Sequence, residues 1–135
     1  MSIEKTFCNI FVPISVGELI DKITILEIKK KYMSGEKMKN VNNEFKSLKV
    51  ILNDEKLEID QNLYLKLKKI NSSLWKIEDK IRIKESLKEF DEDFIELARS
   101  VYKINDERSQ IKREINLKYN SGIVEEKSYE KYESS

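Results

Sequence analysis

Residues 63–81, LYLKLKKINSSLWKIEDKI, and residues 94–115, FIELARSVYKINDERSQIKREI, decide the fold. Apolar residues recur at intervals of 4, 3, 4, 3 and 4 in the first stretch. The second shows intervals of 3, 4, 3, 4, 3 and 4 when Arg108 is counted with the apolar residues. This spacing is typical of a helix that presents one seam to a neighbouring helix. The two stretches therefore predict two long helices, over about residues 60–87 and 91–119.

The two predicted helices are joined by only a few residues, so they must form an antiparallel hairpin over about residues 60–119. Asp91 is placed to cap the second helix, with Glu92 and Asp93 in its first turn. Folding the chain about residue 89 predicts interhelical salt bridges on the flank of the seam, between Arg82 and Glu96 and between Asp79 and Arg99. Such exposed pairs favour register more than stability.

Two shorter helices are predicted before the hairpin and are expected to cover it. Ser15 and Glu18 match a capping box, which starts a helix over residues 16–33. The turn at residues 34–37 contains Gly35, which is expected to terminate that helix. A second helix is predicted over residues 38–52.

The remaining segments complete an all-α helical bundle, a single domain over residues 1–135. Residues 7–14 form a short apolar run with one proline, which predicts an extended lead-in packed on the domain, with Cys8 buried in it. Residues 124–132 are expected to form a short C-terminal helix.

Composition excludes several classes of function. The 26 basic and 25 acidic residues leave a net charge of +1, so no electrostatic footprint for nucleic acid or for a membrane surface is expected. The absence of histidine removes the commonest general base and metal ligand. With a single cysteine, no disulfide or cysteine-based zinc site can form within the chain. The N-terminus lacks the apolar run of a signal peptide, which favours a cytoplasmic location.

Arg108 is the exception in the apolar seam, because it occupies a position where the pattern favours leucine or isoleucine. A buried guanidinium needs a carboxylate or several acceptors. One interpretation is a structural ion pair, with Glu78 or a carboxylate of the first helix as the partner. The alternative is a binding site for an anionic molecule. The candidate ligand-binding residues are Arg108, Lys112, Asn71, Asn105, Trp75 and Glu78.

A metal site is not predicted. Glu18-x-x-Asp21 is similar to half of the magnesium site of all-helical nucleotide pyrophosphatases. The second half would need another carboxylate one turn after Glu78-Asp79, where this sequence has Arg82. No metal and no other cofactor is therefore expected.

Several motifs together resemble one known family. They include Gly17-Glu18-Leu19-Ile20-Asp21, Leu74-Trp75 with Ile77-Glu78-Asp79, and Phe94-Ile95-Glu96-Leu97-Ala98-Arg99, and the resemblance extends over nearly the whole chain. The chain resembles a family of small uncharacterised all-helical proteins from marine bacteria and their phages. The resemblance implies a single complete domain and assigns no catalytic residue.

Two functions follow as hypotheses. The first is a helical interaction or scaffold protein that forms a homo-oligomer, most simply a dimer, since the long hairpin exceeds what the shorter helices can cover. The second is a small enzyme or ligand-binding protein for an anionic metabolite, phosphorylated or sugar-linked, which would use Arg108 and its neighbours.

Overall fold

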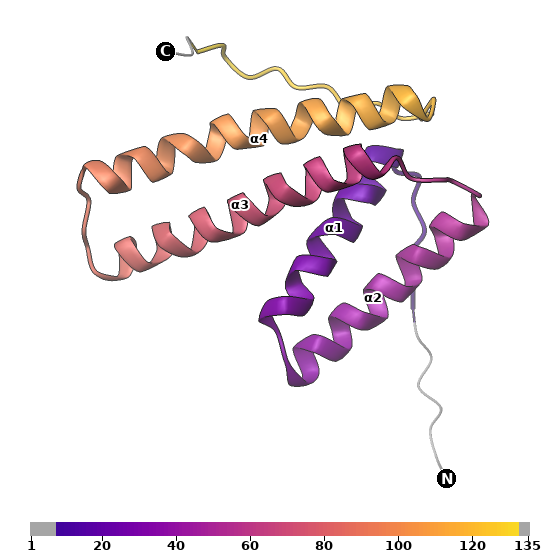
Figure 1. The fold of residues 1–135 in the computed structure, drawn as a ribbon, viewed down its shortest axis with the longest axis horizontal. Helices are drawn as coiled ribbons and strands as arrows, with labels where there is room; N and C mark the ends of the chain where they lie inside the picture. The colour runs from indigo at the N-terminus through magenta and orange to yellow at the C-terminus, as the bar shows by residue number, and fades with distance from the viewer. Residues whose placement is uncertain (1–7, 133–135) are drawn as a thin grey trace.

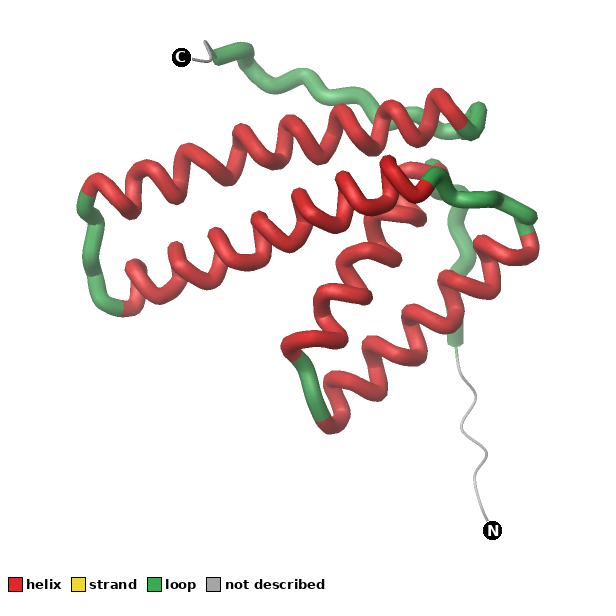
Figure 2. Tube along the Cα trace, in the orientation of Figure 1, coloured by secondary structure: helices red, strands yellow, loops and turns green. Residues whose placement is uncertain are grey.

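The protein is an all-α bundle of four helices, seen in a computed structural model that describes residues 8–132. The helices are α1 (Val16–Tyr32), α2 (Gly35–Asp54), α3 (Gln61–Ser86) and α4 (Glu92–Lys118). Figure 2 shows helices and loops alone, with no strand in the described part of the chain. The predicted fold class is confirmed, and the two long helices form the expected antiparallel hairpin (Figure 1).

Helix α1 is the centre of the fold. It packs against α2, α3 and α4, and eight of its residues are buried. One apolar cluster joins Ile20 to Leu67 of α3 and to Ile115 of α4, and a second joins Leu19 and Ile23 to Leu52 of α2. Helix α2 makes its helix packing with α1, so the expectation that both short helices cover the hairpin is wrong for α2.

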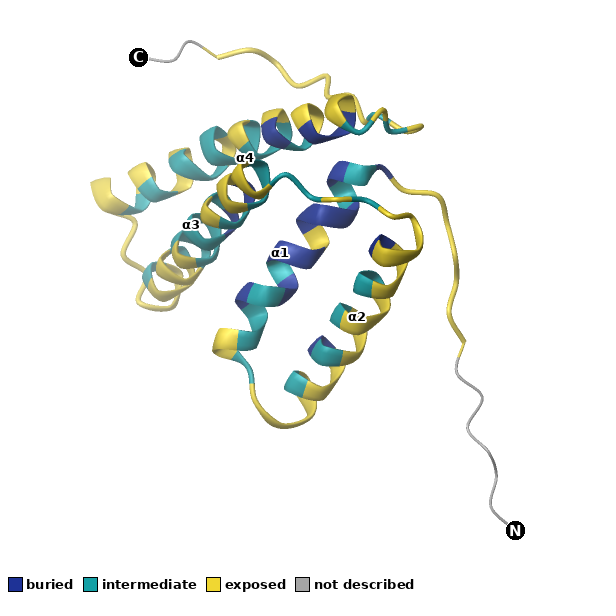
Figure 3. Ribbon diagram, turned by 45° about the vertical axis from the view of Figure 1, so that its right-hand side comes forward, coloured by how far each residue is buried: buried dark blue, intermediate teal, exposed yellow. Residues whose placement is uncertain are grey.

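The pair α1 and α2 stands at an angle to one end of the hairpin, and the opposite end of the hairpin projects beyond it (Figure 1). Burial follows this arrangement, with the buried residues concentrated along α1 (Figure 3). No residue from 72 to 110 is buried. We call residues 72–110 the outer hairpin.

The turn between α1 and α2 is shorter than predicted. Gly35 was expected to end the first helix, but it is the first residue of α2 and has a φ of +62°. A positive φ is accessible to glycine at little cost, and it allows the chain to reverse over Met33 and Ser34. Helix α2 consequently begins three residues earlier than Met38.

The predicted C-terminal helix over residues 124–132 is wrong, since these residues form no helix. The segment runs back along α4 instead (Figure 1). Glu125 accepts hydrogen bonds from Ser15 and Asn116, and Tyr132 donates to Asp106 of α4 at 2.8 Å. A helix of nine residues is marginal by itself, and these side-chain contacts favour an extended path.

Residues 8–14 of the N-terminal lead-in are exposed where packing was predicted, and Phe7 lies outside the described residues. Ile10 and Phe11 are 85% and 81% exposed, and Cys8 is exposed. The other three helices pack on α1, so its apolar surface is already occupied by them. The predicted salt bridges between α3 and α4 are also wrong, because each arginine has a nearer carboxylate on its own helix. Arg82 pairs with Glu78 and Arg99 pairs with Glu96, each one turn away on the same helix.

Candidate functional site

A buried aspartate lies at the junction of α1, α3 and α4. The side chain of Asp21 is 1% exposed, and its Oδ1 accepts from Nδ2 of Asn71 at 2.8 Å and from Nε of Arg108 at 3.0 Å. Nη2 of Arg108 donates to the second oxygen of Asp21. Asn71 also donates to Thr24, whose hydroxyl donates to the backbone carbonyl of Asp21 at 2.7 Å. Asp21 therefore orients polar groups from two other helices.

Lys112 adds a second cation to this junction. Its Nζ lies 2.5 Å from Oε2 of Glu18 and 3.8 Å from Oδ2 of Asp21. Two carboxylates from α1 thus meet two cations from α4, and their formal charges cancel. The hydrogen bond to Asp21 raises the pKa of Arg108 above its ordinary value, so the guanidinium stays charged. We call Asp21, Glu18, Arg108 and Lys112 the charge cluster.

The α1 backbone approaches α4 closely beside the charge cluster. The amide of Gly17 donates to Oδ1 of Asn116 at 2.6 Å. A Cβ atom on Gly17 would lie 2.5 Å from the carbonyl oxygen of Lys112. This residue must lack a side chain for the two helices to meet at this distance. The side chain of Glu18 contacts Lys112 and Lys22, while Ser15 Oγ accepts from the Glu18 amide at 3.0 Å.

An open cleft of about 570 Å³ adjoins the charge cluster. It lies between α1 and the hairpin, and its wall includes apolar residues of α1 and α3 as well as polar residues of α3 and α4. The lining residues are Ile25, Ile28, Asn71, Leu74, Trp75, Glu78, Asp79, Arg82, Asn105 and Arg108. The indole ring of Trp75 stacks on Tyr32, with ring centroids 5.1 Å apart.

The structure brings five of the six candidate ligand-binding residues to this one cleft: Asn71, Trp75, Glu78, Asn105 and Arg108. Lys112 lies away from it, where it contacts Glu18. Glu78, a candidate partner for Arg108, pairs instead with Arg82 at 2.5 Å. The partner of Arg108 is a carboxylate of the first helix, as one of the two sequence interpretations allowed.

In the sequence Asp21 stands out only as part of an incomplete metal-binding motif. In the structure it is the carboxylate that accepts hydrogen bonds from Asn71 and Arg108. A signal was present, because Gly17, Asp21 and Thr24 follow one another at helical spacing on one side of α1. Within residues 8–132, no three acidic or cysteine side chains converge as metal ligands. The carboxylates of Glu18 and Asp21 are directed at cations of α4 instead.

The arrangement is suited to holding helices in register and to presenting one fixed guanidinium at a cleft. The protein is thus an all-helical protein built on a long hairpin, and its charge cluster, which has no net charge, joins α1 to that hairpin. The chain belongs to a family of unknown function (DUF6165), whose model matches residues 10–135. No curated protein matches the chain. No solved structure matches it either. Across residues 8–132, every helix is too short or too polar to cross a membrane.

Proposed function

We propose that this protein is a helical interaction protein that forms a homodimer through its outer hairpin. The observation that carries the proposal is the absence of any buried residue from 72 to 110, in a segment whose sequence has a regular apolar seam. A four-helix bundle buries seams of this kind in a common core, whereas here the seam between α3 and α4 stays partly exposed.

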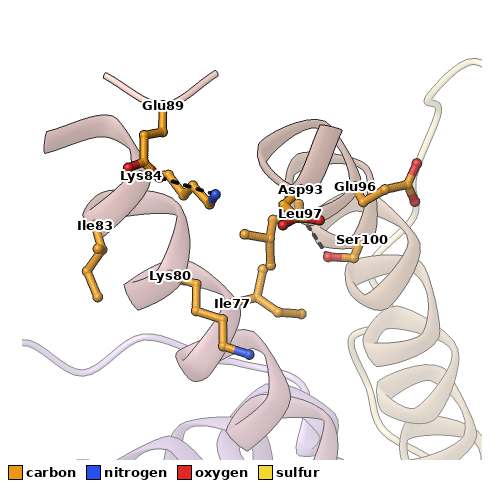
Figure 4. Close-up of a pocket in the computed structure, with 9 residues that line it drawn as sticks. All are labelled: Ile77, Lys80, Ile83, Lys84, Glu89, Asp93, Glu96, Leu97 and Ser100. Carbon is orange, nitrogen blue, oxygen red and sulfur yellow. Dashed lines mark hydrogen bonds and ion pairs between the residues drawn. The ribbon is translucent and has the colours of Figure 1, made fainter. Parts of the chain in front are cut away.

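Apolar side chains are exposed at the end of the outer hairpin. Ile83, Leu87 and Phe90 are 58%, 61% and 57% exposed. A groove of about 560 Å³ runs between α3 and α4 in the same region. Figure 4 shows the side chains of Ile77 and Leu97 pointing toward one another across this groove, with charged side chains around them. Apolar surface rimmed by charges is characteristic of a protein interaction site.

The distribution of charge favours a second copy of the chain as the occupant. Residues 91–96, the cap and first turn of α4, contain four carboxylates and no cation, whereas residues 80–88, the end of α3 and the turn after it, contain four cations and one carboxylate. A two-fold axis along the hairpin, which sets two outer hairpins side by side with their turns at the same end, brings the acidic segment of each copy toward the basic segment of the other. The apolar seams of both copies then form one four-helix bundle.

The proposal is tested by the mass of the protein in solution, measured by light scattering or sedimentation at micromolar concentrations. We expect twice the monomer mass. The variant Ile83→Glu should give a monomer, since it places a charge in the groove at an exposed position where the monomer tolerates it. Val50→Glu on α2 is the matched control, because Val50 is 56% exposed and lies outside the outer hairpin. It should leave the dimer intact.

Two results would contradict the proposal. The first is a wild-type protein that stays monomeric at high micromolar concentration. The second is a dimer that survives Ile83→Glu and dissociates with Val50→Glu, which would move the interface to α2. We also propose a cytoplasmic location, which the N-terminal sequence favours, and an origin in marine bacteria or their phages, which the family resemblance implies.

A further inference from the structure

The guanidinium of Arg108 has an edge that the fold does not use. Arg108 pairs with Asp21 side-on, through Nε and Nη2. An arginine side chain has five N–H donors, and two of its edges each match a carboxylate. Among the hydrogen bonds of residues 8–132, none uses Nη1 of Arg108. Side-on pairing directs the outer edge, formed by Nη1 and Nη2, away from Asp21, and Arg108 lines the open cleft.

Four of the ten residues that line the cleft are apolar. Ile25 and Ile28 line it from α1, and Leu74 and Trp75 line it from α3. Stacking on Tyr32 restrains the indole of Trp75. The volume of about 570 Å³ lies within the range of small-molecule sites, which is about 300–1,000 Å³. An apolar wall with a few fixed polar groups is the usual composition of such a site.

The charges around the cleft limit the ligand further. Asp21 compensates the charge of Arg108, Arg82 compensates that of Glu78, and Asp79 adds a third carboxylate, so these five side chains carry a net charge of −1. A dianion such as phosphate would meet repulsion from this net negative charge. A single carboxylate meets less repulsion and matches the planar outer edge of the guanidinium. Asn105 lies one helical turn from Arg108 and offers an amide donor on the same side of α4.

We propose that this cleft binds a small monocarboxylate with an apolar body. The carboxylate lies on the outer edge of Arg108 beside Asn105, and the apolar body lies against Trp75 and Leu74. Asp21 acts through Arg108, since it fixes the orientation of the guanidinium. This site shares no lining residue with the groove between α3 and α4 that is proposed for the dimer, so it goes beyond the dimer and does not depend on it.

Trp75 provides the measurement, because it is the only tryptophan of the chain and lines the cleft. The full-length protein is titrated with 3-phenylpropionate, phenylacetate and hexanoate while tryptophan fluorescence is recorded. We expect saturable changes for at least one of these carboxylates. The matching neutral amide should bind at least tenfold more weakly, and acetate and inorganic phosphate should give no saturable change at the same concentrations.

Variants assign the signal to Arg108. Arg108→Lys keeps the cation beside Asp21 and removes the planar edge, and it should weaken binding at least tenfold. Asn105→Asp is a second variant, at a position that is not buried, and its added carboxylate should weaken binding by repulsion. Arg113→Lys is the control, since Arg113 is on the same helix, pairs with Glu126 and lies outside the cleft. It should bind as the wild type does.

The proposal is overturned if none of the three carboxylates binds or if the neutral amide binds equally well. It is also overturned if phosphate binds as tightly as the carboxylates, or if Asn105→Asp and Arg108→Lys both bind normally. Light scattering on the same samples measures self-association separately, so that loss of the dimer is not mistaken for loss of the ligand.

Discussion

At the scale of single residues, Asp21 is the residue on which the junction of three helices depends. It is fully buried, and its carboxylate accepts from Asn71 and Arg108. Removing one partner from a buried ion pair is costly because the other charge remains without compensation. The side chain of Arg108 is 28% exposed and can reach solvent, whereas Asp21 cannot. Loss of the ion pair is therefore most costly for Asp21, whose charge would remain buried without a partner.

We predict that Arg108→Leu lowers the free energy of unfolding by about 3 kcal/mol, because it leaves a buried carboxylate with an amide and a more distant lysine. Adding Asp21→Asn to Arg108→Leu should recover part of that loss, since the uncompensated charge is then absent. Urea unfolding of both single variants and the double variant at one protein concentration gives the coupling energy, expected at about 1–3 kcal/mol. Additive effects would show that the two side chains do not interact.

Gly17 gives a second prediction at this scale. The variant Gly17→Ala places a methyl group 2.5 Å from a backbone carbonyl oxygen of α4, so α1 and α4 must separate. We expect a loss of about 1–3 kcal/mol, the usual cost of overpacking, measured by urea unfolding. Gly122→Ala is the control, because a Cβ atom there meets nothing within 4 Å. Equal stability of Gly17→Ala and wild type would mean that the helices separate at no cost.

At the scale of elements, α1 is attached to α3 by a polar contact as well as by the core. Nζ of Lys68 lies 2.9 Å from Glu27, and both side chains are less than a third exposed. Partial burial raises the pKa of Glu27. Hydrogen bonds from Lys68 and Tyr64 and the charge of Lys68 together lower this pKa by more, so the net shift is downward. Burial, together with the hydrogen bond to Glu27 and the charge of Glu27, raises the pKa of Tyr64.

This shift predicts how the contact depends on pH. A carboxylate whose pKa is lower in the folded state stabilises the fold fully above its unfolded pKa, and that contribution is lost as pH falls through the folded pKa. We therefore expect Glu27→Gln to be less stable than wild type at pH 7, by up to about 1 kcal/mol, with the difference shrinking below about pH 4.5. Urea unfolding from pH 7 to pH 3 measures it, with Glu114→Gln as an exposed control. A difference that grows with acidity would contradict the assignment.

At the scale of the whole molecule, the core and the outer hairpin differ in how they are stabilised. Helix α1 is covered by three helices, whereas the outer hairpin has two helices and no buried residue. Helix α3 alone extends about 39 Å at 1.5 Å per residue, more than the 17 residues of α1 can accompany. The outer hairpin should therefore open locally at a lower free energy than the core.

Hydrogen exchange should reveal this difference. In dilute protein, amides of residues 76–100 should exchange faster than those of residues 19–28, because few buried contacts oppose their opening. Their protection should increase with protein concentration, since a partner that binds the folded hairpin stabilises it by mass action. Mass spectrometry at two concentrations measures both effects. Protection of residues 76–100 that is independent of concentration would contradict an interface on the outer hairpin.

Local patterns in the sequence were sufficient to predict the four helices and the hairpin. The seam residues, the caps at Ser15 and Asp91, and the short connection between the long helices act over one or two turns, and the structure confirms them. The exact start of α2 was not predictable in the same way, because it depends on the conformation that Gly35 adopts in a two-residue turn.

The candidate site was predictable only in part. Arg108 could be selected from the sequence because a cation interrupts an otherwise apolar seam, and its neighbours on the cleft follow from hairpin register. Its partner depends on how α1 crosses the hairpin, a long-range packing that no local pattern specifies. Asp21 lies 87 positions from Arg108 in the sequence. Glu78, the other candidate partner, pairs with Arg82, which is four residues away on the same helix.

The helices, their pairing into a hairpin and the residue that breaks its seam thus follow from local sequence, because these features depend on side chains a few positions apart. Three other features arise only when the chain packs: the face of α1 that meets the hairpin, the packing of α2 on α1, and the path of residues 121–132 along α4 without forming a helix. Each of these outcomes depends on competition among distant surfaces for the same apolar and charged partners, and that competition is settled only when the whole chain packs.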